Sequence, residues 1–171
     1  MVAIKWHDKP VKHVVRSAGI SSRGWEIPPY HGDWQVGAAR VFEEDSVIVN
    51  LMPHMHFRGK SDKYTAVYPD GSREVLLNVP RYDFAWQQTY TFKEPKRIPA
   101  GTRVEVQMVF DNSTDNVWVR DPERPVGWGG MTDDEMNIGW TEFANAEPIE
   151  DIMNHDFGDI GTGVEDLEEL E

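Results

Sequence analysis

The chain has 171 residues, no cysteine and a formal net charge of −13. Its length is enough for one domain with its own core. The missing cysteines exclude disulfides, thiolate metal sites and thiol nucleophiles, and the acidity argues against a nucleic-acid partner, for which a basic surface is expected. No apolar run approaches the roughly 18 residues of a transmembrane helix, so we expect no membrane span.

The negative charge is concentrated at the C-terminal end. Residues 145–171 contain ten acidic residues and no lysine or arginine, whereas the rest of the chain carries 20 acidic residues against 17 basic ones. We therefore expect an acidic, partly disordered extension over 145–171, with a docking strip for a basic partner as the alternative. Residues 1–24 are expected to form a lead-in segment and residues 25–144 the folded domain.

Short runs in which apolar and polar residues alternate predict strands throughout the body of the chain. Turn residues separate these runs, and the sequence PDGS at 69–72 predicts a hairpin between two of them. About eight strands with regular turns indicate an all-β fold, an eight-stranded antiparallel jelly-roll-like β-sandwich. In chain order, the predicted strands are 12–18, 34–42, 46–52, 63–69, 73–79, 88–92, 103–110 and 136–143.

The most informative motif is an H-x-H pair, His54 and His56, in the stretch LMPHMHFRGK. Side chains alternate between the two faces of a strand, so both histidines would point the same way, with Cα atoms about 6.6 Å apart. Two imidazoles at that separation can bind one metal ion. The alternative is a pair of ordinary surface or core histidines. Arg58 and Lys60 follow the pair and predict either an anion site or solvent contacts at a strand end.

A metal site on this pair needs a third ligand. The other four histidines have no partner at metal-ligand spacing, and each is expected to be structural or solvated. The remaining soft donors are methionines, and two imidazoles with a thioether suit copper, Cu(I) above all, because a soft sulfur favours a soft ion. Spacing alone does not select one of the candidates, which are Met52, Met55, Met108, Met131, Met136 and Met153.

Four blocks of the sequence carry a resemblance to a known family: LMPHMHFRGK, YTAVYPDGSREVLLNVPRYDFAWQQTYTF, IPAGTRVEVQMVFDNSTDN and WGGMTDDEMNIGW. In this order they resemble the C-terminal domain of the copper type II, ascorbate-dependent monooxygenases, the relatives of peptidylglycine α-hydroxylating monooxygenase and dopamine β-monooxygenase, and above all the bacterial multidomain members. The resemblance covers residues 12–143. It implies a jelly-roll-like domain with one copper ion on an H-x-H pair and on the Met of a DEM motif.

Carried over by motif, the copper ligands implied by the resemblance are His54, His56 and Met136. Asp134 and Glu135 fill the same motif. Their own residue types predict either surface acids near the start of a strand or side chains that support the copper ligands.

In this family the copper ion binds O2 and inserts one oxygen atom into an activated C–H bond, with ascorbate or another external reductant as electron source. The resemblance therefore implies an O2-activating domain for C–H hydroxylation of an organic substrate, in an extracytoplasmic (periplasmic or secreted) setting. The first ten residues show no apolar signal-peptide region, which predicts either a cytosolic protein or a mature or excised piece, and we favour the second interpretation. Nothing in the sequence matches the family's first domain, so we expect an N-terminal copper or redox domain as partner.

Two positions depart from the peptide-hydroxylating members, which hold the substrate with an Arg two residues before the first histidine and a Tyr four residues after the Met ligand. Met52 and Trp140 stand there, which suits an apolar or aromatic substrate better than a peptide C-terminus. Two other functions stay open: a copper carrier or electron-transfer module without oxygenase activity, and a recognition β-sandwich that uses the loop aromatics Trp118 and Trp128 and no metal.

Overall fold

The computed structural model describes residues 13–145. The acidic extension expected over 145–171 therefore lies outside the described residues, apart from Asn145 at the end of the last strand. Within residues 13–145 there is no α-helix, and so no helix that is long and apolar enough to cross a membrane. The strands are β1 (Arg16–Ser21), β2 (Glu26–Ile27), β3 (Trp34–Phe42), β4 (Ser46–His54), β5 (Gly59–Val67), β6 (Arg73–Val79), β7 (Tyr90–Ile98), β8 (Thr102–Phe110), β9 (Val126–Gly127) and β10 (Ile138–Asn145).

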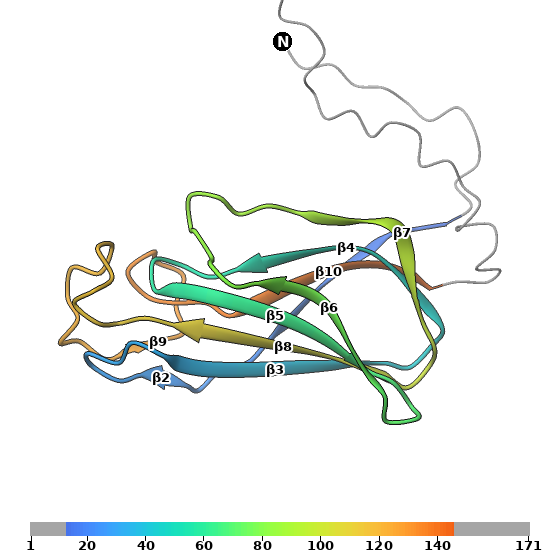
Figure 1. The fold of residues 1–171 in the computed structure, drawn as a ribbon, viewed down its shortest axis with the longest axis horizontal. Helices are drawn as coiled ribbons and strands as arrows, with labels where there is room; N and C mark the ends of the chain where they lie inside the picture. Colours follow the sequence, from blue (N-terminus) through green and yellow to red (C-terminus); the bar gives the residue numbers. More distant parts are fainter. Residues whose placement is uncertain (1–12, 146–171) are drawn as a thin grey trace, which may run out of the picture.

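Eight of the described strands form two four-stranded antiparallel sheets, which face each other as the layers of a sandwich (Figure 1). The sheets have the orders β1-β10-β4-β7 and β3-β8-β5-β6, while β2 and β9 form a separate two-stranded ribbon. Counting only the eight long strands, the first pairs with the last, the second with the seventh, the third with the sixth and the fourth with the fifth. A chain folded back on itself in this way and wrapped into two sheets is a jelly roll, so the predicted fold class is confirmed.

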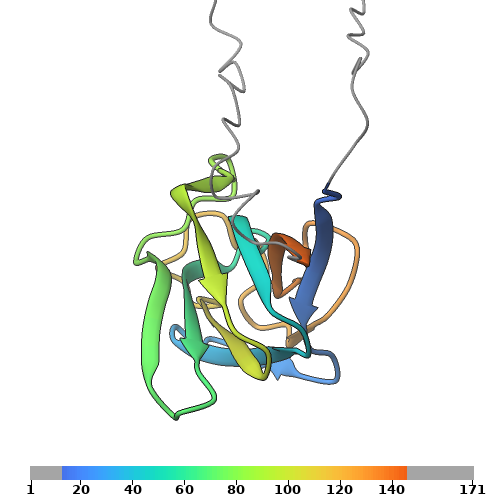
Figure 2. The same cartoon turned by 90° about the vertical axis from the view of Figure 1, so that its right-hand side faces the viewer.

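The observed strand ends differ from the predicted ones at most of the strands. Two predicted strands, 34–42 and 73–79, coincide with β3 and β6. Others are displaced because pairing with a neighbouring strand decides where a strand begins and ends. The strand predicted at 12–18 is observed as β1 at Arg16–Ser21, and it pairs with β10 (Figure 2). Part of the expected lead-in over 1–24 thus forms an edge strand of the sandwich.

The core lies between the two sheets. Alternate residues of β8, namely Val104, Val106, Met108 and Phe110, are buried, while the residues between them are half-buried or exposed. The two sheets approach each other closely at Gly139 of β10, where a Cβ atom would lie 2.6 Å from a methyl carbon of Val106. The central pair β4–β10 is therefore packed closely on its inner face, and its outer face carries His54, the first histidine of the motif.

Candidate metal site

The two histidines of the motif lie next to each other, although only one of them is on a strand. His54 is the last residue of β4, and His56 lies in the turn that follows. Their ring centroids are 5.2 Å apart, and the ring planes are nearly perpendicular at 85°. With metal–nitrogen bonds of about 2 Å, two imidazoles on one tetrahedral ion have centroids roughly 5 Å apart. The observed ring spacing is therefore compatible with a shared ion.

Each histidine ring has an oxygen acceptor at Nδ1. His54 Nδ1 lies 2.6 Å from Gln87 Oε1, and His56 Nδ1 lies 3.1 Å from the carbonyl oxygen of Asp134. The Gln87 amide nitrogen donates to the Phe84 carbonyl at 3.0 Å, which orients the amide with its oxygen toward His54. In the neutral rings, Nδ1 therefore carries the proton and Nε2 the lone pair, which is the tautomer that binds a metal ion through Nε2.

His56 is also biased toward its neutral form. The residue is only 5% exposed, and burial lowers its pKa, against the opposing effect of hydrogen bonds to the backbones of Asp134 and Met131. Because a protonated imidazole cannot bind a metal, this shift favours the state in which His56 can act as a ligand.

Glu135 fixes the histidine turn against the start of β10. It is fully buried, and its carboxylate accepts hydrogen bonds from the backbone amides of His56 at 2.8 Å, Arg58 at 2.6 Å and Met136 at 3.2 Å. Oε2 serves both His56 and Met136, so the backbones of these two predicted ligands are held side by side. Burial raises the pKa of Glu135 to about 7, while the three amides act in the opposite direction. The prediction of a surface acid is wrong for Glu135.

The loop that precedes Met136 is itself fixed by backbone contacts. The Gly129 amide donates to the Glu135 carbonyl at 2.9 Å, and the Glu135 amide donates to the Gly127 carbonyl at 3.1 Å. A Cβ atom at Gly129 would overlap the Asp134 side chain, so only glycine allows the two segments to approach this closely. The Asp134 carbonyl is thereby held where the His56 ring can reach it.

Met136 lies close to the histidine turn at the level of the backbone. Ile138 pairs with His54, and Met136 is two residues earlier on the same segment, with a half-buried side chain. Among the other candidate methionines, Met55 and Met108 are fully buried in the core. Met153 lies outside the described residues.

The two predicted substrate residues are cross-strand neighbours. Met52 of β4 pairs with Trp140 of β10, and both side chains are half-buried. Met52 and His54 are two residues apart on the same strand and so share a face of the sheet, together with their partners Trp140 and Ile138. The residues predicted to contact a substrate thus lie on the same outer face as the first histidine.

Arg58 and Lys60 do not act together. Arg58 is only 3% exposed and donates from Nε to Asn112 Oδ1 at 2.7 Å and from Nη1 to the Asp133 carbonyl at 2.9 Å. Lys60 is exposed and pairs with Asp33 at 2.6 Å. The expectation of a solvent contact at a strand end therefore describes Lys60 and not Arg58.

Sequence reasoning did not predict the roles of two residues that hold the motif in place. Gln87 was not singled out, because nothing in its surroundings distinguishes it from the neighbouring Gln88. The Tyr82 hydroxyl accepts from the Met55 amide at 3.1 Å and donates to the Met55 carbonyl at 2.6 Å. Tyr82 thereby fixes the residue between the two histidines, a role with no sequence signal because the contact spans 27 residues.

Among the described residues, the histidine pair is not part of a larger cluster of histidine and carboxylate side chains. Within residues 13–145, no group of three or more histidine, aspartate or glutamate side chains is placed to hold a metal ion.

Comparisons with known proteins find matches among solved structures. No protein-family model matches the chain, and no curated protein is similar to it. Similar solved structures include that of the infectious bursal disease virus Gx strain, with 13% identity and a TM-score of 0.34, and the VP2 subviral particle of the same virus, with 12% identity and a TM-score of 0.35. The alignments cover 84% of this chain and 35% and 36% of those chains, so it spans about a third of their length.

Proposed function

We propose that this chain is a mononuclear copper-binding domain that activates O2 for C–H hydroxylation, as one half of a larger copper monooxygenase. The observation that supports the proposal is the pair of Nδ1 hydrogen bonds on His54 and His56, because a proton on Nδ1 leaves the Nε2 lone pair of each of the two adjacent rings available for a metal ion. His54, His56 and Met136 would hold one copper ion. When bound, copper supplies O2 activation, with electrons from ascorbate or another external reductant.

The chain's own residues prepare the donors. Gln87 and the Asp134 carbonyl hold the Nδ1 protons, and burial favours neutral His56. Glu135 holds the backbones of His56 and Met136 together. A set of two nitrogens and one thioether suits a soft ion such as Cu(I), and three protein donors leave room for an external ligand.

We propose an apolar or aromatic organic substrate that binds beside Met52 and Trp140, because these side chains share a sheet face with His54. Completing the two-electron reaction would require the N-terminal copper or redox domain implied by the family resemblance. An extracytoplasmic location is proposed on the same ground.

Copper stoichiometry and oxygen uptake test this proposal together. Metal-free protein would be loaded with copper, freed of excess ion and analysed as wild type, as His54→Ala and as His31→Ala, the last being a control at an exposed histidine outside the motif. We expect one copper ion in wild type and control, none in His54→Ala, and ascorbate-driven O2 uptake only where copper is bound.

The same experiment separates the alternatives. Stoichiometric copper without O2 uptake would favour a carrier or electron-transfer module. Copper bound equally well by His54→Ala would refute the site, and no stoichiometric copper in wild type would leave a recognition β-sandwich.

A further inference from the structure

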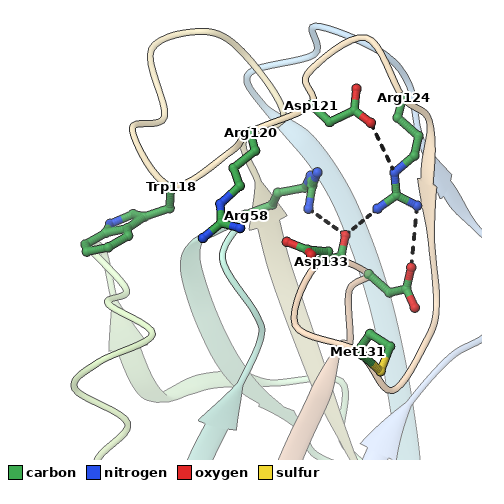
Figure 3. Close-up of a pocket in the computed structure, with 8 residues that line it drawn as sticks. Arg58, Trp118, Arg120, Asp121, Arg124, Met131 and Asp133 are labelled. Carbon is green, nitrogen blue, oxygen red and sulfur yellow. Dashed lines mark hydrogen bonds and ion pairs between the residues drawn. The ribbon is translucent and has the colours of Figure 1, made fainter.

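A cavity of ≈ 420 Å³ lies beside the candidate metal site, lined by Arg58 and by residues of the 118–124 and 131–134 loops (Figure 3). Its volume is in the range of small-molecule sites, roughly 300–1,000 Å³. The walls combine three arginines, three aspartates, one indole ring and one thioether. Which of these charges is already paired within the protein decides what the cavity can bind.

Two of the arginines are occupied by the protein itself. Arg124 lies 3.8 Å from an Asp121 carboxylate oxygen and 3.5 Å from one of Asp134, and it donates to the Asp133 carbonyl at 2.6 Å. Arg58 is buried and donates to the same carbonyl at 2.9 Å. Both guanidinium groups thus fix the backbone at Asp133 (Figure 3).

Arg120 and the Asp133 carboxylate, by contrast, have no ion pair in the part of the chain that the structure describes. Both residues are exposed and line the cavity, and Figure 3 shows Asp133 between Arg58 and Arg120. The cavity therefore offers a ligand one positive and one negative group, with the negative group held on a backbone that two arginines have already ordered.

Trp118 adds an aromatic surface at the mouth of the cavity. Its indole is 61% exposed and stacks on Phe57 with the centroids 6.2 Å apart and the planes inclined by 17°. Phe57 in turn contacts Phe84 edge-on at 4.9 Å. The indole is therefore supported from within the protein, which lowers the entropic cost of stacking a ligand ring on it.

We propose that this cavity binds a small zwitterion that carries an aromatic ring, such as an aromatic α-amino acid. The ligand carboxylate pairs with Arg120, the ammonium group with Asp133, and the ring packs on Trp118. None of these three residues is a predicted copper ligand, so the proposal concerns a separate site and holds for the metal-free chain.

The test is an NMR titration of the metal-free full-length chain with three phenyl ligands that differ in the charged groups they carry. L-phenylalanine carries both groups, 3-phenylpropanoate lacks the ammonium group, and phenethylamine lacks the carboxylate. We expect the shifts to map to the cavity, with L-phenylalanine binding about fivefold more tightly than either analogue, the gain of one partly exposed ion pair.

Charge-removing variants assign each contact. Arg120→Gln should weaken the binding of L-phenylalanine and 3-phenylpropanoate about fivefold and leave the binding of phenethylamine unchanged. Asp133→Asn should weaken the binding of phenethylamine about fivefold and leave that of 3-phenylpropanoate unchanged. Arg97→Gln, at an exposed arginine of β7, is the matched control and should change none of the affinities. Both cavity residues are exposed, so the variants are expected to fold.

Three results would overturn the proposal: equal affinities for the three ligands, equal losses for all three in Arg120→Gln, or no saturable shift at the cavity. Preferential binding of 3-phenylpropanoate over L-phenylalanine would instead define an anion site. Because the titrations use metal-free protein, their failure leaves the copper proposal intact, and a failure to bind copper leaves this one intact.

Discussion

Single polar side chains determine the shape of the H-x-H turn. Glu135 binds three backbone amides, Tyr82 both backbone polar groups of Met55, and Gln87 the ring of His54. The sequence alone identified His54 and His56 as a pair, and Met136 was selected by resemblance. The sequence did not predict that Glu135 is buried, because a charged residue type is ordinarily exposed. Two of its three amide partners, those of His56 and Arg58, are 79 and 77 residues away in the chain.

The histidine orientation should depend on Gln87. Replacing Gln87 by Ala removes the acceptor at His54 Nδ1 and lets the ring rotate or change tautomer, so copper affinity should fall about 10- to 100-fold. Competition against a chelating copper indicator would measure the change. Gln88→Ala, at the exposed neighbour, should bind copper like wild type, and an unaltered affinity in Gln87→Ala would contradict a role for this hydrogen bond.

At the scale of elements, the site depends on β4 and β10 being adjacent in one sheet. Alternation and turn residues located the eight long strands, because each signal is local. They did not show that β4 and β10 pair, since His54 and Ile138 are far apart in sequence and neither strand carries a mark of its neighbour. The blocks of family resemblance supplied the link between the H-x-H and DEM motifs that periodicity could not.

The packing of β10 on the opposite sheet should not tolerate a larger residue at Gly139. A Cβ atom there would meet Val106 at 2.6 Å and the Tyr64 hydroxyl at 3.0 Å, so Gly139→Ala should lower the free energy of unfolding by roughly 1–3 kcal/mol. Urea denaturation would measure this.

Gly37 of β3 is the matched control, because a Cβ atom there comes no closer than 3.9 Å to any neighbouring atom. Gly37→Ala should be neutral or slightly stabilising. Equal stability of the two variants would contradict the close approach of the sheets at Gly139.

For the whole molecule, the sequence predicted the class of fold because a jelly roll needs only about eight alternating strands and regular turns. One residue of the core is an exception to the pattern of apolar side chains facing inward. Asp62 of β5 is 1% exposed, and neither carboxylate oxygen has a hydrogen-bond partner among the described residues. Burial raises the pKa of Asp62 to about 7, and the nearby Lys63 amide acts in the opposite direction. The alternation of polar and apolar residues did not predict a buried aspartate, because the pattern places polar side chains on the solvent side of a strand.

Stability should therefore depend on pH through Asp62. The folded state holds the Asp62 proton more tightly than the unfolded state, so the stabilisation is present at low pH and is lost as the pH rises from about 4 to about 7, at most by about 1.4 kcal/mol per pH unit. Asp62→Asn removes this titration, and its stability relative to wild type should increase between pH 5 and pH 8. Urea denaturation at both values tests this, and a constant difference would contradict it.

The central claim is one copper ion on His54, His56 and Met136. X-ray absorption of the Cu(I)-loaded protein tests it most directly, because sulfur and nitrogen neighbours scatter differently. We predict two imidazole nitrogens and one sulfur in wild type, loss of the sulfur in Met136→Ala, and an unchanged spectrum in Met131→Ala, the exposed methionine of the same loop. A sulfur that persists in Met136→Ala, or a wild-type spectrum with no sulfur, would contradict the account.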